Sequence, residues 1–159
     1  MRRNLFTIVS KSAKKTEAIG RKISSFLCPG DVVCLIGELG AGKTCFSRGL
    51  ISGLGAANKY IGSPTFTIIN EYQGKFPIYH FDLYRLTNET ELEVLGFEEY
   101  FYGSGVTIIE WADKMKKLLP NDRLEIYFSH INETTRRIVF KPKGNLLKEP
   151  YGYNKKKKR

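Results

Sequence analysis

The feature that most constrains the fold is a glycine-rich loop at residues 37–44, GELGAGKT, which fits the pattern G-x-x-x-x-G-K-[ST]. The apolar, β-branched run VVCLI at 32–36 comes directly before it and predicts a strand buried on both faces. A helical pattern follows near 43–54 and ends at Gly55. This order of strand, loop and helix indicates a nucleotide phosphate site, whereas the bare pattern alone would also fit an incidental glycine turn.

Each residue type in this loop has a physical reason to be there. Glycines at 37, 40 and 42 allow backbone angles that point successive N–H groups into one concavity. The helix that starts there adds the positive end of its dipole. Lys43 supplies a mobile ammonium group to phosphate oxygens, and the hydroxyl of Thr44 is placed to ligate a magnesium ion. The loop therefore predicts a nucleoside polyphosphate bound with Mg²⁺.

Length and composition fit one globular domain. A chain of 159 residues with 42% apolar content is enough for a single layered core. No apolar run reaches the roughly 20 residues needed to cross a bilayer, and the N-terminus shows no export signal. We therefore expect a cytoplasmic protein with no membrane partner. The three cysteines include no C-x-x-C pair, which argues against a disulfide framework or a zinc site.

The net charge of +10 is concentrated at the C-terminus, where KKKKR supplies +5. Periodic patterning stops near Gly144, so we expect a domain over 1–143 and a basic, disordered tail over 144–159. Such a run of like charges is ordinarily a solvated tail. Its alternative role is a salt-sensitive attraction to RNA, and both can hold at once.

Strand and helix patterns alternate through the middle of the chain and predict a three-layer α/β domain, with a mostly parallel central sheet and antiparallel closing strands. The expected helices are 12–27, the one near 43–54, one opened by Asn88 that carries Leu92, Leu95 and Phe97, and 112–119. The expected strands are 5–10, 32–36, 65–72, 76–84, 106–111, 123–130 and 136–142. In such sheets, ligands bind at the carboxyl ends of the strands.

Phosphoryl transfer needs an acidic side chain beside the loop to hold the metal ion and orient water, and two apolar runs supply one. Glu110 ends the run VTIIE, where the alternative is an ordinary exposed carboxylate. Asp82 lies in YHFDLYRL among apolar and aromatic residues that should bury it, so it needs a partner. Its alternative to a catalytic or metal-linked role is a structural ion pair, for example with Arg85.

Several further residues have open roles. Thr65 follows Ser63-Pro64 and could sense the γ-phosphate, but turn chemistry alone explains the Ser-Pro pair. Trp111, the single tryptophan, is of a type that more often belongs to a core or rim than to a ligand contact. His80 and His130 stand isolated in the sequence, and we assign neither of them a catalytic role.

Four segments of the chain form a specific set: GELGAGKTCFSRGL, SPTFTIINEY, YHFDLYRL with the following ELEVLGFEEYF, and IIEWADK. In this order and spacing they resemble the TsaE (YjeE) family, bacterial P-loop ATPases that are needed for threonylcarbamoyl modification of adenosine in tRNA. The resemblance covers about residues 5–142 and does not extend to the basic tail. It implies a P-loop NTPase-like domain.

The resemblance also implies roles for individual residues. Thr44 and Glu110 would hold Mg²⁺, and Thr65 and Asp82 would lie in switch-like segments close to the γ-phosphate. The implied catalytic residues are Lys43, Thr65, Asp82 and Glu110. The implied nucleotide contacts are Glu38, Leu39, Gly40, Ala41, Gly42, Lys43, Thr44, Cys45, Trp111 and Arg136, with Arg136 or Arg137 near the base. Whether Asp82 or Glu110 orients the attacking water stays open.

The function implied is that of an accessory ATPase, which hydrolyses Mg-ATP and acts on a partner complex of TsaD and TsaB that transfers threonylcarbamoyl to adenosine 37 of tRNA. Contact with tRNA would be indirect or through the basic tail. Hydrolysis by the isolated protein should be slow, because no arginine finger is evident. Two alternatives remain: a small-molecule kinase of the P-loop class, although no lid-length insertion with paired arginines is present, and a nucleotide-regulated RNA-binding module.

Overall fold

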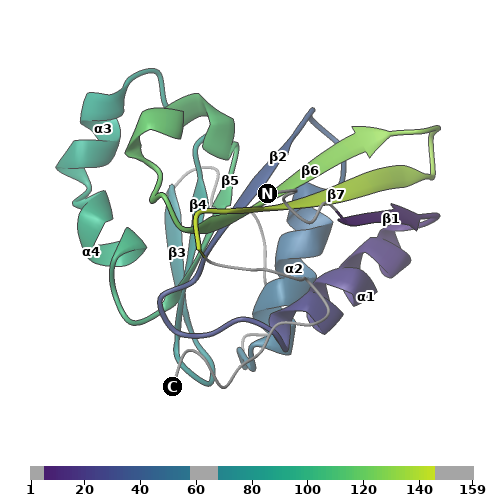
Figure 1. The fold of residues 1–159 in the computed structure, drawn as a ribbon, viewed down its shortest axis with the longest axis horizontal. Helices are drawn as coiled ribbons and strands as arrows, with labels where there is room; N and C mark the ends of the chain where they lie inside the picture. The colour runs from purple at the N-terminus through teal and green to yellow at the C-terminus, as the bar shows by residue number, and fades with distance from the viewer. Residues whose placement is uncertain (1–5, 58–67, 146–159) are drawn as a thin grey trace.

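The computed structural model describes residues 6–57 and 68–145, and in this part of the chain seven strands form one sheet (Figure 1). The sheet order is β1-β7-β6-β2-β5-β4-β3. The strands are β1 (Phe6–Ser10), β2 (Val32–Gly37), β3 (Ile69–Gln73), β4 (Pro77–Asp82), β5 (Val106–Glu110), β6 (Arg123–His130) and β7 (Arg136–Lys143). The helices are α1 (Ala13–Ser24), α2 (Lys43–Gly53), α3 (Glu89–Val94), α4 (Phe97–Phe101) and the 3-10 helix η1 (Ala112–Leu118).

The sheet is parallel in its centre and antiparallel at both edges. β2 pairs in parallel with β5 and β6, and β5 pairs in parallel with β4. At one edge β3 is antiparallel to β4, and at the other β7 is antiparallel to both β6 and β1. The predicted architecture is therefore confirmed. The pairing of β1 with β7 joins the two ends of the described chain, which no local pattern in the sequence indicates.

Three layers enclose two apolar cores. Helices α1 and α2 cover one face of the sheet, while α3, α4 and η1 cover the other (Figure 1). Along β2, Val33 and Leu35 belong to the core under α1 and α2, and Val32 and Cys34 belong to the opposite core. Successive side chains of a strand point to opposite faces, so β2 is apolar throughout because both of its faces are covered.

The helix expected after Asn88 is interrupted. Asn88 does cap α3, because its side chain accepts a hydrogen bond from the backbone N–H of Glu91. Gly96 then adopts a φ of +70° and separates α3 from α4. The expectation of one helix carrying Leu92, Leu95 and Phe97 is therefore wrong: Leu92 lies in α3, Leu95 is its C-cap, and Phe97 begins α4.

Two further boundaries differ from the sequence pattern. The strand expected at 106–111 ends at Glu110, because Trp111 leaves the extended conformation with a φ of +60°. The strand expected at 65–72 begins at Ile69 within the described chain, and residues 58–67 lie outside it. Residues 146–159, which include nearly all of the expected tail, lie outside it as well, so the expected tail stays a prediction.

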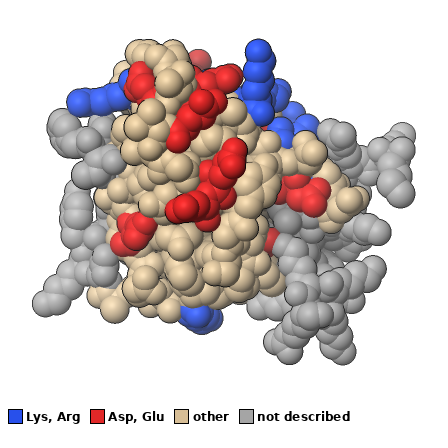
Figure 2. Space-filling view, turned by 90° about the vertical axis from the view of Figure 1, so that its left-hand side faces the viewer, with Lys and Arg blue, Asp and Glu red and all other residues tan. Residues whose placement is uncertain are grey.

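Acidic side chains gather on the face formed by α3 and α4, as Figure 2 shows. The sequences ETELEV and FEEYF of these two helices contribute five glutamates. The overall excess of positive charge therefore does not cover this face. Among the described helices, none has the length and apolar character that crossing a membrane requires.

Candidate functional site

The glycine-rich loop joins β2 to α2, and its glycines are needed for two different reasons. Gly40 and Gly42 have φ angles of +76° and +107°, a region that strains residues with a side chain. Gly37 does not share this conformation. A Cβ atom at Gly37 would lie 2.6 Å from the carbonyl oxygen of Phe128 on β6. The expectation that all three glycines serve backbone angles is therefore corrected for Gly37, which close packing requires.

Lys43, the first residue of α2, folds back over the loop. Its ammonium group donates hydrogen bonds to the carbonyl oxygens of Gly37 and Glu38, the latter at 2.8 Å, and lies 4.0 Å from the centroid of a Trp111 ring. Lys43 is only 5% exposed, and burial lowers its pKa, with the charge of Glu110 as the largest opposing influence. The cation is thus already held inside the loop, where a polyphosphate would meet it.

Glu110 ends β5 with both carboxylate oxygens in use. Its Oε1 accepts a hydrogen bond from the hydroxyl of Thr44 at 2.9 Å, and its Oε2 lies 2.5 Å from Nε2 of His80 on β4. Glu110 is 1% exposed and His80 is fully buried. This burial excludes the reading of Glu110 as an ordinary exposed carboxylate.

His80 is the residue that sequence reasoning missed. We expected it to be isolated, yet it is in direct contact with Glu110. One signal was available: His80 and Asp82 are two residues apart on a strand, so both side chains point to the same face of the sheet. That signal could not be used without knowing that β4 lies beside β5.

Asp82 ends β4 next to Glu110, and the two are direct partners in the pairing of β4 with β5. Asp82 is 6% exposed, and its Oδ1 accepts a hydrogen bond from the backbone N–H of Tyr84 at 2.9 Å. The two carboxylates thus lie together at the carboxyl ends of parallel strands, where α/β sheets bind ligands.

Trp111 forms part of the rim of this site. Its backbone N–H donates to the carbonyl oxygen of Leu35 at 3.1 Å, and its ring centroid lies 5.0 Å from that of Tyr84. A left-handed backbone is uncommon for a bulky residue and is found disproportionately at functional sites. Here it turns the indole off the line of β5 and over the ammonium group of Lys43.

A cavity of about 360 Å³ brings most of the predicted residues together. It is lined by Leu39, Gly40, Gly42, Lys43, Thr44, Cys45, Asp82, Tyr84, Glu110 and Trp111. Glu38 and Ala41 are not among its lining residues: Glu38 is exposed, and Ala41 is buried in the core. Thr65 lies outside the described residues, so its role stays a prediction.

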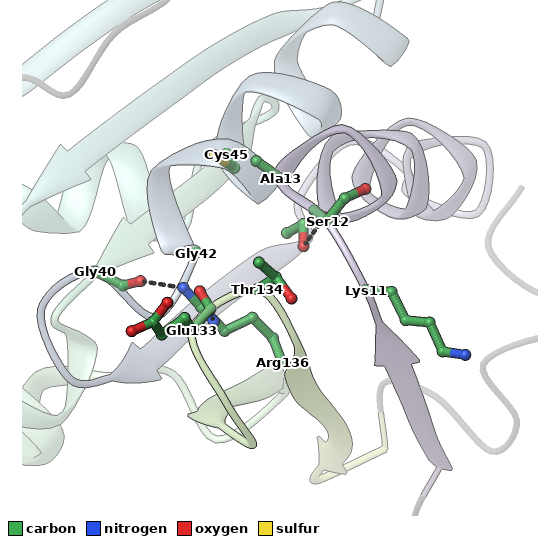
Figure 3. A pocket seen from close by; sticks show the side chains of 10 residues that line it. Lys11, Ser12, Ala13, Gly40, Gly42, Cys45, Glu133, Thr134 and Arg136 are labelled. Atoms are coloured by element: carbon green, nitrogen blue, oxygen red, sulfur yellow. Dashed lines mark hydrogen bonds between the residues drawn. The ribbon is translucent and has the colours of Figure 1, made fainter.

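A second cavity, of about 390 Å³, adjoins the first, because Gly40, Gly42 and Cys45 line both (Figure 3). Its other lining residues are Lys11, Ser12, Ala13, Thr16, Glu133, Thr134 and Arg136. Sequence reasoning did not find the residues from the turn between β1 and α1. Their position depends on the placement of β1 at the edge of the sheet, which the local pattern does not reveal.

Arg136 ties the turn between β6 and β7 to the glycine-rich loop. Figure 3 shows its guanidinium group reaching Gly40, to whose carbonyl oxygen it donates at 3.3 Å. The same group donates to the carbonyl oxygens of Asn132 and Glu133 at 2.9 Å and 3.0 Å. Arg137, the other candidate for the nucleotide base, is exposed and lines neither cavity.

The donor set at Thr44 and Glu110 fits a magnesium ion. It offers one hydroxyl and one carboxylate, and the described residues contain no group of three His, Cys, Asp or Glu side chains that could hold a metal ion. Mg²⁺ is usually bound by one or two side chains together with substrate phosphates and water. Zinc requires a fuller set of protein ligands, so the site suits magnesium better.

Known proteins resemble the chain over most of its length. The family described as "Threonylcarbamoyl adenosine biosynthesis protein TsaE" matches residues 10–138. A Bacillus subtilis (strain 168) protein named "tRNA threonylcarbamoyladenosine biosynthesis protein TsaE" is 46% identical over 133 residues, which are 83% of this chain and 82% of the relative. A protein of the same name from Treponema pallidum (strain Nichols) is 40% identical over 131 residues, which are 82% and 96% of the two chains.

A solved structure agrees with these relatives. The crystal structure of Bacillus subtilis YdiB matches with a TM-score of 0.78 and 37% identity, over 91% of this chain and 90% of that one. The family match at 10–138 contains every residue that lines the two cavities. The predicted resemblance is confirmed, and the chain belongs to the TsaE family.

Proposed function

We propose that this chain binds and hydrolyses Mg-ATP as an accessory protein in the threonylcarbamoyl modification of adenosine 37 in tRNA. The family supports the modification, because its relatives are named for tRNA threonylcarbamoyladenosine biosynthesis. The observation that carries the ATPase proposal is the hydrogen bond between Thr44 and Glu110 beside the ammonium group of Lys43. It places a hydroxyl and a carboxylate, two groups that suit Mg²⁺, beside a glycine-rich loop of the kind that binds phosphates.

The loop holds the polyphosphate through its backbone N–H groups and through Lys43. Gly40 and Gly42 have the left-handed backbone angles that allow loop N–H groups to turn toward a bound anion. On binding, Lys43 exchanges the carbonyl oxygens of Gly37 and Glu38 for phosphate oxygens. Since its ammonium group is already buried, its attraction for the phosphates is screened little by water.

Thr44 and Glu110 would hold the magnesium ion. When bound, Mg²⁺ would offset negative charge on the phosphate oxygens. Because Thr44 and His80 already occupy the two oxygens of Glu110, we assign the orientation of the attacking water to Asp82, the other carboxylate of the cavity. Lys43 stabilises the charge on the transferred phosphoryl group, and Thr65 is the predicted contact on the γ-phosphate side.

The second cavity takes the nucleoside. It shares Gly40, Gly42 and Cys45 with the phosphate cavity, so a nucleotide can lie across the loop with its ribose and adenine against Thr16 and Arg136. Cys45, in the first turn of α2, lines both cavities and would contact the nucleotide where base and phosphates meet.

The partners are TsaD- and TsaB-like proteins, with tRNA reached through them or through the basic tail. Hydrolysis by the isolated chain is expected to be slow and to rise when partners complete the site. The cytoplasmic location expected from the sequence stays a prediction.

The test is tRNA modification reconstituted from purified components, with and without this chain. Addition of the chain should be required, and Lys43→Ala and Glu110→Ala should each abolish its effect. Lys116→Ala is the matched control, because Lys116 is exposed on η1 and lines neither cavity. Full modification with Lys43→Ala would contradict the proposal, and so would fast ATP turnover that added partners leave unchanged.

A further inference from the structure

His80 is a fully buried histidine beneath the proposed site, and the proposed reaction assigns it no task. It lies in the middle of β4, paired with Ile108 of β5 on one side and Asn70 of β3 on the other. It lines neither cavity, so it is not placed to touch a nucleotide. Among the described residues, its ring contacts one polar group, Oε2 of Glu110, at 2.5 Å.

Two anchors at opposite oxygens fix the orientation of the Glu110 carboxylate. His80 holds Oε2, and Thr44 donates to Oε1 at 2.9 Å. A rotation of the carboxylate about its last bond breaks both contacts at once. Thr44 belongs to the phosphate loop, so its hydroxyl changes partners when a ligand arrives. His80 lies in the sheet, away from both cavities, and is the anchor that stays.

The chemistry of the pair defines the proton on His80. An ionised carboxylate only accepts hydrogen bonds, so Nε2 of His80 must be the donor. Nδ1 of His80 is buried and has no hydrogen-bond partner among the described residues. The contact with Glu110 therefore places a ring hydrogen of His80 on Nε2.

A competitor for Glu110 explains why such an anchor is needed. The ammonium group of Lys43 is close enough for the charge of Glu110 to oppose the lowering of the Lys43 pKa by burial. Without His80, Oε2 would be a buried anionic oxygen with no partner, and turning toward Lys43 would relieve it. That ion pair would draw the ammonium group from the phosphates and the carboxylate from the metal.

We propose that His80 is a positioning residue, which holds the Glu110 carboxylate toward Thr44 and away from Lys43 and thereby sets the affinity for the divalent cation bound with the nucleotide. This inference rests on the proposed function, because it concerns the same cation site. Residues that orient a metal ligand typically contribute about 10- to 100-fold to metal affinity.

The test compares two variants of nearly equal size. His80→Gln keeps an N–H donor at roughly the reach of Nε2, whereas His80→Met fills the same space without a donor. Calorimetry measures ADP binding by the full chain with and without Mg²⁺, and circular dichroism checks that each variant is folded. We expect His80→Met to lose at least about tenfold of the gain in ADP affinity that Mg²⁺ confers. His80→Gln should retain most of that gain, and ADP binding without Mg²⁺ should change little in either variant.

A thermodynamic cycle separates positioning from general support of the fold. In a Glu110→Gln background, His80→Met should have no further effect on the Mg²⁺ dependence, because both changes act through one carboxylate. An equal loss in His80→Gln and His80→Met, or additive losses in the cycle, would overturn the inference. If Mg²⁺ raises the ADP affinity of His80→Met as much as that of the unmodified chain, the inference about His80 is overturned but the proposed function is not. Absence of any magnesium-dependent binding by the unmodified chain overturns the proposed function as well.

If His80→Met fails to fold, NMR of the His80 ring in the unmodified chain tests the same inference. The chain has only two histidines, so ¹⁵N-labelled histidine gives two sets of ring signals in long-range ¹H–¹⁵N spectra. The buried ring should carry its proton on Nε2, and the signal of this proton should move in Glu110→Gln. A ring proton on Nδ1 instead, or a signal that does not respond to Glu110→Gln, would show that His80 does not hold Glu110.

Discussion

Asp82 and Glu110 face each other as direct partners on two parallel strands, although 28 positions separate them in the chain. Directly opposed residues share a face of the sheet, and like charges there are unfavourable unless each has other partners. Each does have one: Tyr84 donates its backbone N–H to Asp82, while Thr44 and His80 contact Glu110. The sheet thus carries two carboxylates side by side with different surroundings, which is the basis for giving them different tasks.

Substitution of these two carboxylates should separate metal binding from hydrolysis. Asp82→Asn should lower the partner-stimulated rate of ATP hydrolysis by about 100-fold or more, with little change in Mg-ADP affinity, because a water-orienting group acts in the transition state. Glu110→Gln should instead weaken the Mg²⁺ dependence of binding by about tenfold or more. Steady-state rates and calorimetry on both variants make the comparison. Equal effects of the two substitutions on both quantities would contradict the assignment.

The left-handed backbone at Gly40 should matter specifically for nucleotide affinity, beyond its effect on the free energy of unfolding. Gly40→Ala introduces a side chain at a φ of +76° with no atom within 4 Å, so we expect a loss of about 1–2 kcal/mol in the free energy of unfolding. It should also weaken ADP binding, because a changed backbone conformation at Gly40 would turn the loop N–H groups away from the phosphates. Gly96→Ala is the matched control: its φ of +70° and open surroundings are alike, but it lies between α3 and α4.

Denaturant unfolding measures the stability of these two variants, and calorimetry measures their ADP affinity. Both should lose similar stability, and only Gly40→Ala should lose affinity. Weaker binding by Gly96→Ala to the same extent would show that binding follows overall stability and not the conformation of the loop.

Arg136 should favour nucleotides over bare phosphates. Arg136→Ala removes a cation that lines the second cavity, so we expect about tenfold weaker ADP binding and a change of less than about threefold for inorganic pyrophosphate. Arg137→Ala is the control, since Arg137 is a neighbouring exposed arginine outside both cavities. Competition binding with the two ligands measures both affinities. Parallel losses for ADP and pyrophosphate would mean that Arg136 acts through its contact with Gly40 and not through the nucleoside.

A buried carboxylate on β6 should make stability depend on acid pH. Glu125 is 1% exposed; burial alone would raise its pKa, but hydrogen bonds from Tyr127 and Arg123, with the charges of Arg123 and Lys143, outweigh burial and lower it. A carboxylate with a lowered pKa in the folded state stabilises the fold fully above its ordinary value of 4.5. That contribution is lost as the pH falls through the lowered value.

Thermal unfolding of the unmodified chain and of Glu125→Gln between pH 7 and pH 3 checks this dependence. At pH 7 the variant should be less stable by roughly 2 kcal/mol, because a charged acceptor is replaced by a neutral one. The difference between the two proteins should shrink below pH 4.5. A difference that stays constant down to pH 3 would show that the charge of Glu125 contributes nothing.

Much of the fold follows from local patterns, and the exceptions have local causes that the pattern cannot weigh. The run VVCLI predicted β2, and burial on both faces is the reason that the pattern is continuous. The pattern after Asn88 predicted one helix, but Gly96 can adopt a positive φ at little cost, and the chain uses it to turn between α3 and α4. Apolar spacing alone does not tell whether such a glycine continues a helix or ends it.

By itself, the sequence determined the loop at 37–44, the strand before it and the helix after it, because the interactions involved join residues a few positions apart. Only the tertiary structure decided which distant groups meet there. Glu110 contacts Thr44, 66 positions away, and His80, 30 positions away. Arg136 contacts Gly40, 96 positions away. These contacts depend on the order β7-β6-β2-β5-β4 in the sheet. The free energy that selects this order comes from burying both faces of the sheet at once, a property of the whole chain that no short segment carries.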